Sequence, residues 1–244
     1  MLKDYVVIDL EMTGLNPKND KILEVAAIRI RNGREAESFS AIVNPGVPLS
    51  EKVIALTGIS QEQAENGSRM DETLREFLEF IGEDILLGQN IIFDFSFLKQ
   101  WAVNHKLALE KKAVDTLKLA RQLLPAEQKK DLGSLCIYFK IPRVNAHRAL
   151  EDARETAQIF EKMKILYGEE NPALFEPKYL QYKAKRQSPA TAHQKEYLKR
   201  FAQYHGIELP EMSPELTKSE ASRLTDHLIA QYGKMQEKKE TAYE

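Results

Sequence analysis

The sequence predicts an α/β protein: a mixed β-sheet flanked by helices on both faces, followed by a small helical module. Apolar β-branched runs separated by turns occupy residues 5–45, helical and strand patterns alternate over residues 70–168, and only helical patterns occur in residues 191–233. Strands that first follow one another and then alternate with helices are typical of mixed sheets covered on both faces.

The first part of the chain is predicted to form three strands. Val6–Ile8, Ile22–Ile30 and Phe39–Val43 are rich in apolar and β-branched residues, which favour strand structure. The segments between them carry the turn-forming residues Gly14, Pro17, Asn32 and Gly33. Short turns therefore join these strands in chain order.

The middle part alternates helices with short strands. A helix is predicted up to Gly82, because apolar residues recur with helical spacing before it, at Leu74, Phe77, Leu78 and Ile81. Short strands are expected at Ile85–Leu87 and Ala113–Val114. The other helices expected here are Phe95–Ala102, Leu117–Leu124, Leu132–Phe139 and one from Ala149 to a stop at Gly168.

The chain beyond Gly168 is predicted to be a basic linker and a helical module. Prolines interrupt residues 169–190 and no periodicity is visible there. Two helices are expected afterwards, each starting with a capping box, Thr191 with Gln194 and Thr217 with Glu220. The predicted domains are therefore 1–168, the linker 169–190, the helical module 191–233 and the charged tail 234–244.

The balance of charged residues limits how this protein could bind a polyanion. The 244 residues contain 35 Lys and Arg against 37 Asp and Glu, for a formal net charge of −2. A near-neutral chain does not hold nucleic acid or anionic lipid by bulk charge alone, so a polyanionic substrate would need a basic patch or a bound cation.

The sequence also indicates the compartment. Cys136 is the only cysteine, which excludes an intramolecular disulfide and fits a reducing environment. The first residues lack the apolar region of a signal peptide, and no segment approaches the roughly 20 apolar residues of a membrane span. We expect a cytoplasmic protein that does not bind membranes.

Two carboxylates end the first predicted strand. Asp9 and Glu11 follow Val6–Ile8, and residues i and i+2 of a strand point to the same face. Carboxylates held together repel each other unless a cation lies between them, and oxygen ligands favour Mg²⁺ or Mn²⁺. Taken alone, the pair is more typical of a solvated strand end.

Two later segments carry similar groups. Asp94 is expected in the first turn of a helix, where a carboxylate can also simply interact with the helix dipole. His147 precedes the last helix of this part and Asp152 lies in its first turns, where they can cap the helix. As an active pair, they would offer a metal ligand and a base of a residue type that titrates near neutral pH.

The order of these segments resembles the DEDDh exonucleases, whose fold is ribonuclease-H-like. Asp-x-Glu, then Asn-x-x-Phe-Asp, then His-x-x-x-x-Asp follow one another across the chain. The resemblance covers residues 5 to about 167, and further echoes are Leu56-Thr57-Gly58-Ile59 and Val114-Asp115-Thr116. Within the family, the sequence is most similar to proofreading 3′→5′ exonuclease domains and epsilon-type subunits of bacterial DNA polymerase III.

The resemblance implies phosphodiester hydrolysis with two divalent ions, Mg²⁺ or Mn²⁺, about 3.5–4 Å apart. Asp9 would bridge the ions, Glu11 and Asp152 would complete the ion that activates water, and Asp94 would support the second ion. His147 would take the proton of the attacking water. The substrate would contact Met12, Thr13, Gly14, Leu15, Asn90 and Phe93.

The expected substrate is the 3′ end of single-stranded or frayed DNA, and a DNA polymerase subunit is a candidate partner. Two departures keep RNA open as an alternative. Met12 stands where proofreading exonucleases usually have Thr, which makes the first motif similar to that of oligoribonucleases. Gln89 stands where a His often precedes the Asn. A catalytically silent binding module is the third alternative, which the presence of all five site residues disfavours.

The basic stretch before the helical module is a second candidate site. Residues 177–200 hold seven Lys and Arg against one Glu, a net charge of +6, with Tyr179, Tyr182 and Tyr197 interleaved. Such a stretch binds a nucleic-acid strand by charge and stacking, or it is a solvated tether. The residues expected to contact DNA are Lys183, Lys185 and Arg186. The terminal helices faintly resemble SAP-type DNA-binding modules, an analogy only.

Overall fold

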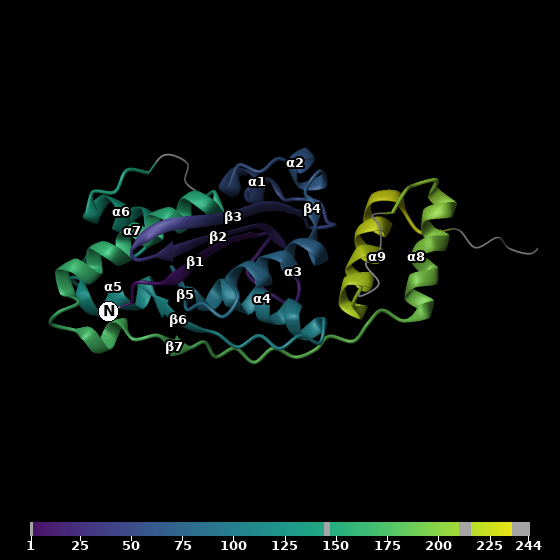
Figure 1. The fold of residues 1–244 in the computed structure, drawn as a ribbon. Helices are drawn as coiled ribbons and strands as arrows, with labels where there is room; N and C mark the ends of the chain where they lie inside the picture. Colours follow the sequence, from purple (N-terminus) through teal and green to yellow (C-terminus); the bar gives the residue numbers. More distant parts are fainter. Residues whose placement is uncertain (1, 144–146, 210–215, 236–244) are drawn as a thin grey trace, which may run out of the picture. The chain divides into compact units, whose positions relative to one another are not determined.

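The computed structural model describes residues 2–143, 147–209 and 216–235, and the chain separates into two compact units, Met1–Ala184 and Lys185–Glu244 (Figure 1). We call them the N-terminal unit and the C-terminal unit. Among the described residues, the N-terminal unit holds a seven-stranded sheet in the order β4-β3-β2-β1-β5-β6-β7. The strands are β1 Tyr5–Met12, β2 Ile22–Arg31, β3 Arg34–Asn44, β4 Ser68–Arg69, β5 Leu86–Gly88, β6 Lys112–Asp115 and β7 Lys178–Tyr179.

The sheet is mixed, as the sequence predicts. Strand β2 is antiparallel to β1 and β3, whereas β5 and β6 run parallel to β1. The helices of this unit are α1 Glu51–Thr57, α2 Gln61–Glu65, α3 Met70–Ile81, α4 Ile92–Asn104, α5 Thr116–Leu123, α6 Leu132–Phe139 and α7 Ala149–Tyr167, followed by the 3₁₀ helix η1 Pro172–Phe175. The predicted α/β class with helices on both faces is confirmed.

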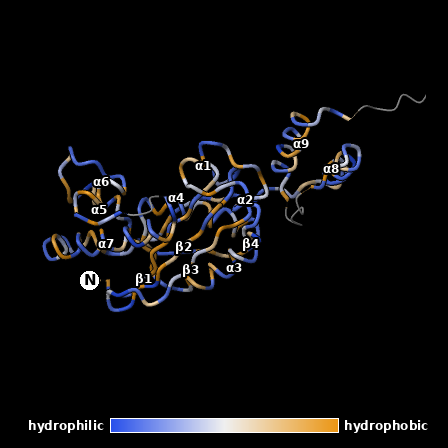
Figure 2. The backbone as a smooth tube through the Cα atoms, turned by 90° about the horizontal axis from the view of Figure 1, so that it is seen from above, coloured by the Kyte–Doolittle hydropathy of each residue, from blue (hydrophilic) through white to orange (hydrophobic). Residues whose placement is uncertain are grey.

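Side chains of β1 alternate between two cores. Val6, Ile8 and Leu10 pack in the core formed with α3 and α4. Tyr5 and Val7 pack in the other core, formed with α5, α6 and α7. The central strands β1 and β2 are accordingly hydrophobic along much of their length (Figure 2). Because strand residues alternate, the odd-numbered residues that follow Val7 face the α7 side of the sheet.

The predicted linker begins too early, because residues 169–184 belong to the N-terminal unit. Phe175 and Leu180 are 3% and 8% exposed and pack in the two cores. Strand β7 pairs with β6, and the N–H of Leu180 donates to the carbonyl of Lys111 at 2.9 Å. The two-residue strand β7 and the single buried residues Phe175 and Leu180 are too short and too widely spaced to give a periodic pattern. The sequence of this segment therefore resembles that of a linker.

The C-terminal unit contains the two expected helices, α8 Ala192–His205 and α9 Lys218–Tyr232. Both predicted capping boxes are present, at Thr191 with Gln194 and at Thr217 with Glu220. The helices enclose a small core of Ala190, Leu198, Phe201, Ala221 and Leu228. Leu224 of α9 packs against this core and is only partly buried. Most of the predicted charged tail, residues 236–244, lies outside the described residues.

Candidate active site

The carboxylates of β1 lie at its C-terminal end on the face covered by α7. The alternation of β1 puts Asp9 and Glu11 on this face, after Tyr5 and Val7. Carboxylate oxygens of Glu11 and Asp152 and a ring nitrogen of His147 lie within 4.8 Å of one another. The strand end and the start of α7 therefore meet, as the sequence-predicted cluster requires.

Asp94 joins the cluster from the other helical layer. It lies in the first turn of α4 and is buried, and its Oδ1 accepts the backbone N–H of Leu10 at 3.0 Å. This bond ties the start of α4 to the residue between the two β1 carboxylates. The charge of Asp94 is close enough to raise the pKa of Asp9. The five DEDDh residues, distant in the sequence, are thus neighbours in the fold.

His147, two residues before α7, has an unusual backbone conformation. His147 adopts a left-handed conformation with φ 61°. Its backbone N–H donates to the carboxylate of Asp152, which links the histidine directly to the first turn of the helix. A non-glycine residue in this region is uncommon and is held there by surrounding contacts.

The electrostatics of the cluster indicate a cation site. Burial, and after it the neighbouring carboxylates, raise the pKa of Asp9 well above its usual range. Burial and the charge of Asp152 raise the pKa of Glu11 to about 8, and burial raises the pKa of Asp94 to about 7. Burial also raises the pKa of Asp152, although Arg143 opposes the effect. Because their pKa values are raised, these carboxyl groups retain protons when no metal is bound. A divalent cation can replace those protons and stabilise the ionised carboxylates, which are ligands of the type that such cations prefer.

Two arginines and two further acids surround the cluster, and the sequence interpretation missed all four. Arg148 pairs with the buried Glu24 of β2 at 2.9 Å. Arg143 contacts Asp152 at 2.9 Å and the buried Glu155 at 3.1 Å. Glu24 was detectable as the one acid inside an apolar strand. Arg143 and Glu155 give no sequence signal, because their pairing is a tertiary contact between α7 and a residue outside that helix.

Glu24 and Glu155 thus each have an arginine, while Asp152 shares Arg143. Among the described residues, no ion-pair partner is present for Asp9, Glu11 or Asp94. The positive charge that the protein itself supplies is therefore smaller than the negative charge that converges at this edge of the sheet.

The expected substrate loop follows the carboxylates directly. Thr13 exchanges backbone and side-chain hydrogen bonds with Lys21 at 2.9 Å. A Cβ at Gly14 would lie 2.4 Å from the carboxylate of Asp20, so only glycine fits there without movement. The loop displays Leu15, which is 81% exposed, whereas Met12 packs partly into the sheet core.

The other expected substrate residues lie at the start of α4. Asn90 has φ 57°, and its backbone N–H donates to Asp115 at 3.1 Å. Asp115 also caps α5, which is a structural role. Phe93 is partly buried and packs edge to face on Phe97, with ring centroids 5.5 Å apart.

Gln89 replaces the histidine of related motifs, and its side chain has local partners. Its Nε2 donates to the carbonyl of Lys130 at 2.7 Å, and its Oε1 accepts the hydroxyl of Thr116 at 2.5 Å. The side chain therefore ties the end of β5 to α5 and to the segment before α6. Within these contacts it is a structural link and does not join the carboxylate cluster.

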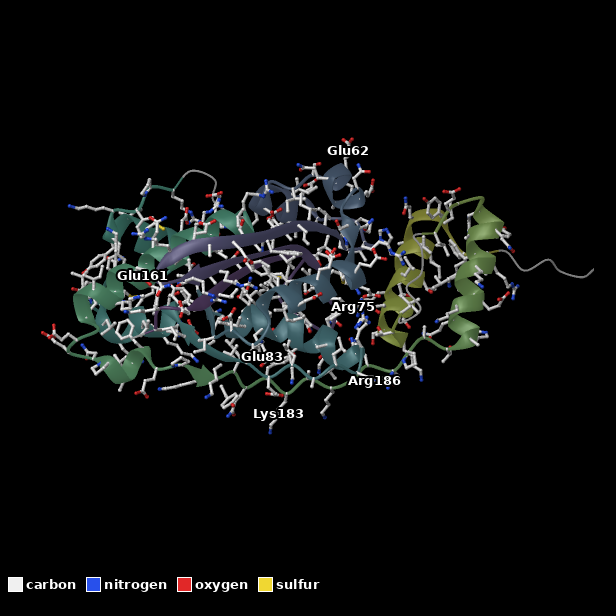
Figure 3. The ribbon with its side chains drawn as sticks, viewed as in Figure 1. Glu62, Arg75, Glu83, Glu161, Lys183 and Arg186 are labelled. Carbon is white, nitrogen blue, oxygen red and sulfur yellow. The ribbon has the colours of Figure 1, made fainter. Side chains whose placement is uncertain are left out.

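Of the proposed basic contacts, Lys183 lies in the N-terminal unit, and the structure does not bring it to this site. Strand β7 runs antiparallel to β6, so the chain after Tyr179 leaves past Lys112, at the N-terminal end of β6. The carboxylates lie toward the C-terminal end of β1, which is parallel to β6 through β5. Lys183 points away from the sheet (Figure 3), and Lys185 and Arg186 belong to the C-terminal unit.

Known proteins that are similar to this chain include DNA polymerase III proteins. Residues 6–160 match the family model RNase_T, described as Exonuclease. Over 162 residues the chain is 39% identical to DNA polymerase III PolC-type of Bacillus subtilis strain 168, covering 65% of this chain and 11% of that protein. It is 35% identical over 160 residues to DNA polymerase III subunit epsilon of Aquifex aeolicus, covering 65% of this chain and 79% of that protein. The chain spans about a tenth of the length of its PolC-type relatives.

Solved structures with the same fold include two exonucleases. E. coli exonuclease I in complex with a dT13 oligonucleotide superposes with a TM-score of 0.61 at 19% identity, over 71% of this chain and 44% of that one. The nuclease domain of 3′hExo, a DEDDh family member bound to rAMP, gives a TM-score of 0.59 at 19% identity, over 72% of this chain and 96% of that one. With its matching sequence and its mixed sheet of ribonuclease-H-like topology, the chain belongs to the exonuclease family.

Proposed function

We propose that the N-terminal unit is a metal-dependent 3′→5′ exonuclease that releases mononucleotides from the 3′ ends of single-stranded or frayed DNA, in proofreading or repair. The observation that carries this proposal is the cluster in which Glu11, Asp152 and His147 place ligand atoms within 4.8 Å of one another. Family membership and the position of Asp9 and Asp94 beside the cluster support it.

The proposed metal ligands are Asp9, Glu11, Asp94 and Asp152, and the proposed cofactors are two Mg²⁺ or Mn²⁺ ions. All four donors are carboxylates, which are ligands that these cations prefer. The four carboxylates outnumber the two neighbouring arginines, which supports added positive charge at the site. When bound, such ions offset charge on the scissile phosphate and lower the pKa of a bound water.

His147 is the proposed general base. Its imidazole nitrogen would accept the proton of the attacking water, a role that requires the ring to reach the same space as the carboxylates. The left-handed turn at His147 and its backbone bond to Asp152 hold the residue beside that space.

DNA is the proposed substrate because the matched relatives are named as DNA polymerase III proteins and one structural neighbour holds a dT13 oligonucleotide. A polymerase subunit is the proposed partner for the same reason. The exposed Leu15 and the residues Met12, Thr13, Gly14, Asn90 and Phe93 are proposed to hold the terminal nucleotide. RNA stays the alternative, since another neighbour is bound to rAMP.

The C-terminal unit is proposed to contact longer DNA strands or a partner protein through its basic residues, Lys185 and Arg186 among them, with Lys183 just before it. A cytoplasmic location also stays a prediction. Among the described residues, no helix is both long enough and apolar enough to span a membrane.

The test is digestion of DNA and RNA oligonucleotides of matched length and sequence, labelled at the 5′ end, with Mg²⁺ or Mn²⁺. We expect a ladder of DNA products shortened one nucleotide at a time from the 3′ end, blocked by a 3′-phosphate and abolished by EDTA. Cleavage of a circular single strand as fast as a linear one would overturn the exonuclease proposal. Much faster loss of RNA would assign the oligoribonuclease-like activity instead.

A further inference from the structure

Helix α7, which carries the proposed metal ligand Asp152, begins without a local cap. Its N-cap residue is Arg148, whose side chain makes no capping hydrogen bond. The first N–H of the helix, at Ala149, instead donates to Glu24 of β2 at 3.1 Å. An N-terminal N–H normally needs a side-chain or solvent acceptor, and here the acceptor comes from a residue 125 positions earlier in the chain.

Both carboxylate oxygens of Glu24 contact the start of α7. Glu24 is 1% exposed, so an unpaired carboxylate would be costly there. The Nη2 of Arg148 donates to its Oε1 at 2.9 Å, and the Nε of Arg148 lies 3.3 Å from both of its oxygens. The acid therefore holds two consecutive residues, Arg148 by its side chain and Ala149 by its backbone.

The position of Glu24 connects these contacts to the site. In the β1–β2 pair, Glu24 lies directly opposite Glu11. Arg148 and Ala149 lie between His147 and Asp152 in the chain. One side chain thus connects the strand register that places Glu11 to the helix start that places His147 and Asp152.

We propose that Glu24 is a positioning residue: it acts as a tertiary N-cap that fixes the start of α7 against β1 and β2, and thereby sets the distance between Glu11 and the pair His147 and Asp152. The inference rests on the proposed roles of those three residues. A displacement of about 1 Å in such a site lowers the rate by about 10²-fold.

The alternative is that Glu24 and Arg148 only stabilise the fold. The chain offers a control on the same helix, because the more exposed Glu35 of β3 pairs with Arg154 at 3.1 Å, farther along α7. Glu35→Gln removes an ion pair between α7 and the sheet without touching the helix start. It should leave the kinetic constants and metal affinity unchanged.

Three variants test the proposal: Glu24→Gln removes the charge, Glu24→Asp keeps it but withdraws the carboxylate, and Arg148→Ala removes the half-exposed partner. We expect kcat on a short DNA oligonucleotide to fall about 10²-fold in Glu24→Gln and Glu24→Asp, with KM little changed. Calorimetric titration with Mn²⁺ should show affinity about 10-fold weaker or more, as for other groups that orient metal ligands. Arg148→Ala should show smaller losses of the same kind.

Circular dichroism and the melting temperature in EDTA report folding separately. Wild-type kcat and Mn²⁺ affinity in folded Glu24→Asp would overturn the positioning role, as would equal losses in Glu35→Gln. Failure of the proposed function looks different: the wild-type protein would be inactive, or Asp9→Ala would keep its activity. In that case the Mn²⁺ titrations still decide whether Glu24 positions the carboxylate cluster.

Discussion

The two helices of the C-terminal unit and the two helices that carry the candidate site begin in different ways. In the C-terminal unit, α8 and α9 start at Thr191 and Thr217, each with a complete capping box within four consecutive residues. The two helices that carry the candidate site, α4 and α7, start at Ile91 and Arg148 with no side-chain cap. The start of α7 is satisfied by Glu24 from another element.

This difference separates helix starts that the local sequence determines from starts that the tertiary structure determines. A capping box needs only its own four residues, so it specifies a boundary wherever the helix lies. The acids near the starts of α4 and α7 interact with β1 instead: Asp94 accepts the backbone N–H of Leu10, and the carboxylate of Asp152 lies within 4.8 Å of that of Glu11. Their partners come from the sheet, which fixes the site only when the whole unit is folded.

The largest expected effect concerns Asp9, the carboxylate that the other acids surround. Asp9→Ala should reduce exonuclease activity by about 10³-fold or more, because bound metal is worth several kcal/mol of transition-state stabilisation. Single-turnover digestion of a labelled oligonucleotide measures the loss. Near-normal turnover in this variant would show that the cluster is not the active site.

The next effect concerns the residue just before α7. His147→Ala should lose about 10²–10⁴-fold in rate if the imidazole takes the proton of the attacking water. Binding of Mn²⁺ and of DNA should persist, since carboxylates supply the proposed metal ligands. A variant with unchanged rate and pH profile would assign the proton to another group.

Truncation compares the units directly. A chain ending at Ala184 should keep the N-terminal unit folded and active on short oligonucleotides, because the sheet and the site precede this residue. A chain ending at Gly168 loses the buried Phe175 and Leu180, which contribute roughly 3–6 kcal/mol of folding free energy together. Thermal melting of both chains measures the difference. Equal melting temperatures of the two chains would indicate that the N-terminal unit ends at Gly168, as the sequence predicts.

The chain ending at Gly168 is expected to be less stable, so a change in its DNA affinity would not report DNA contacts alone. The affinity for a long DNA strand is therefore compared between the full chain and the chain ending at Ala184. If basic residues of the C-terminal unit contact phosphates, the dissociation constant for a long strand should rise and its dependence on salt should flatten. Identical salt slopes would favour contact with a protein partner.

The pH dependence of stability should differ between the metal-free and metal-bound protein. The pKa values of Glu11 and Asp94, about 8 and about 7, lie above those of exposed carboxyls. The folded, metal-free protein therefore retains protons that the unfolded chain has released, and its stability falls as pH rises from about 5 to about 8. Melting in EDTA across this range should show the decline, and excess Mn²⁺ should reduce or reverse it. Stability that rises with pH in EDTA would contradict these pKa shifts.

The smallest effects concern the locally capped helices. Thr191→Ala and Thr217→Ala should each cost about 1 kcal/mol of stability in the C-terminal unit. Hydrolysis of short oligonucleotides by the full chain should stay unchanged, because these caps lie in the other unit. A loss of activity comparable to that of His147→Ala would show that the locally capped helices also influence the active site.

The sequence by itself determined the features that depend on neighbouring residues. Runs of apolar and β-branched residues identified β1 and β2, helical spacing identified α3, and the threonine capping boxes set the starts of α8 and α9. The order of short motifs predicted the family and the five residues that the fold then brings together. The roles of these residues stay predictions.

Only the tertiary structure decided what depends on contacts across the chain. Residues 169–184 belong to the N-terminal unit because the two-residue strand β7 pairs with the edge of β6, and no local sequence pattern predicts that pairing. Glu24 becomes the cap of α7 because folding places it within hydrogen-bond distance of Ala149, 125 positions away. Arg143 becomes the partner of Asp152 across a separation that matches no regular spacing within a helix or strand. A buried charge takes its partner from whatever the fold places beside it, so these assignments follow from the packed structure and not from sequence spacing.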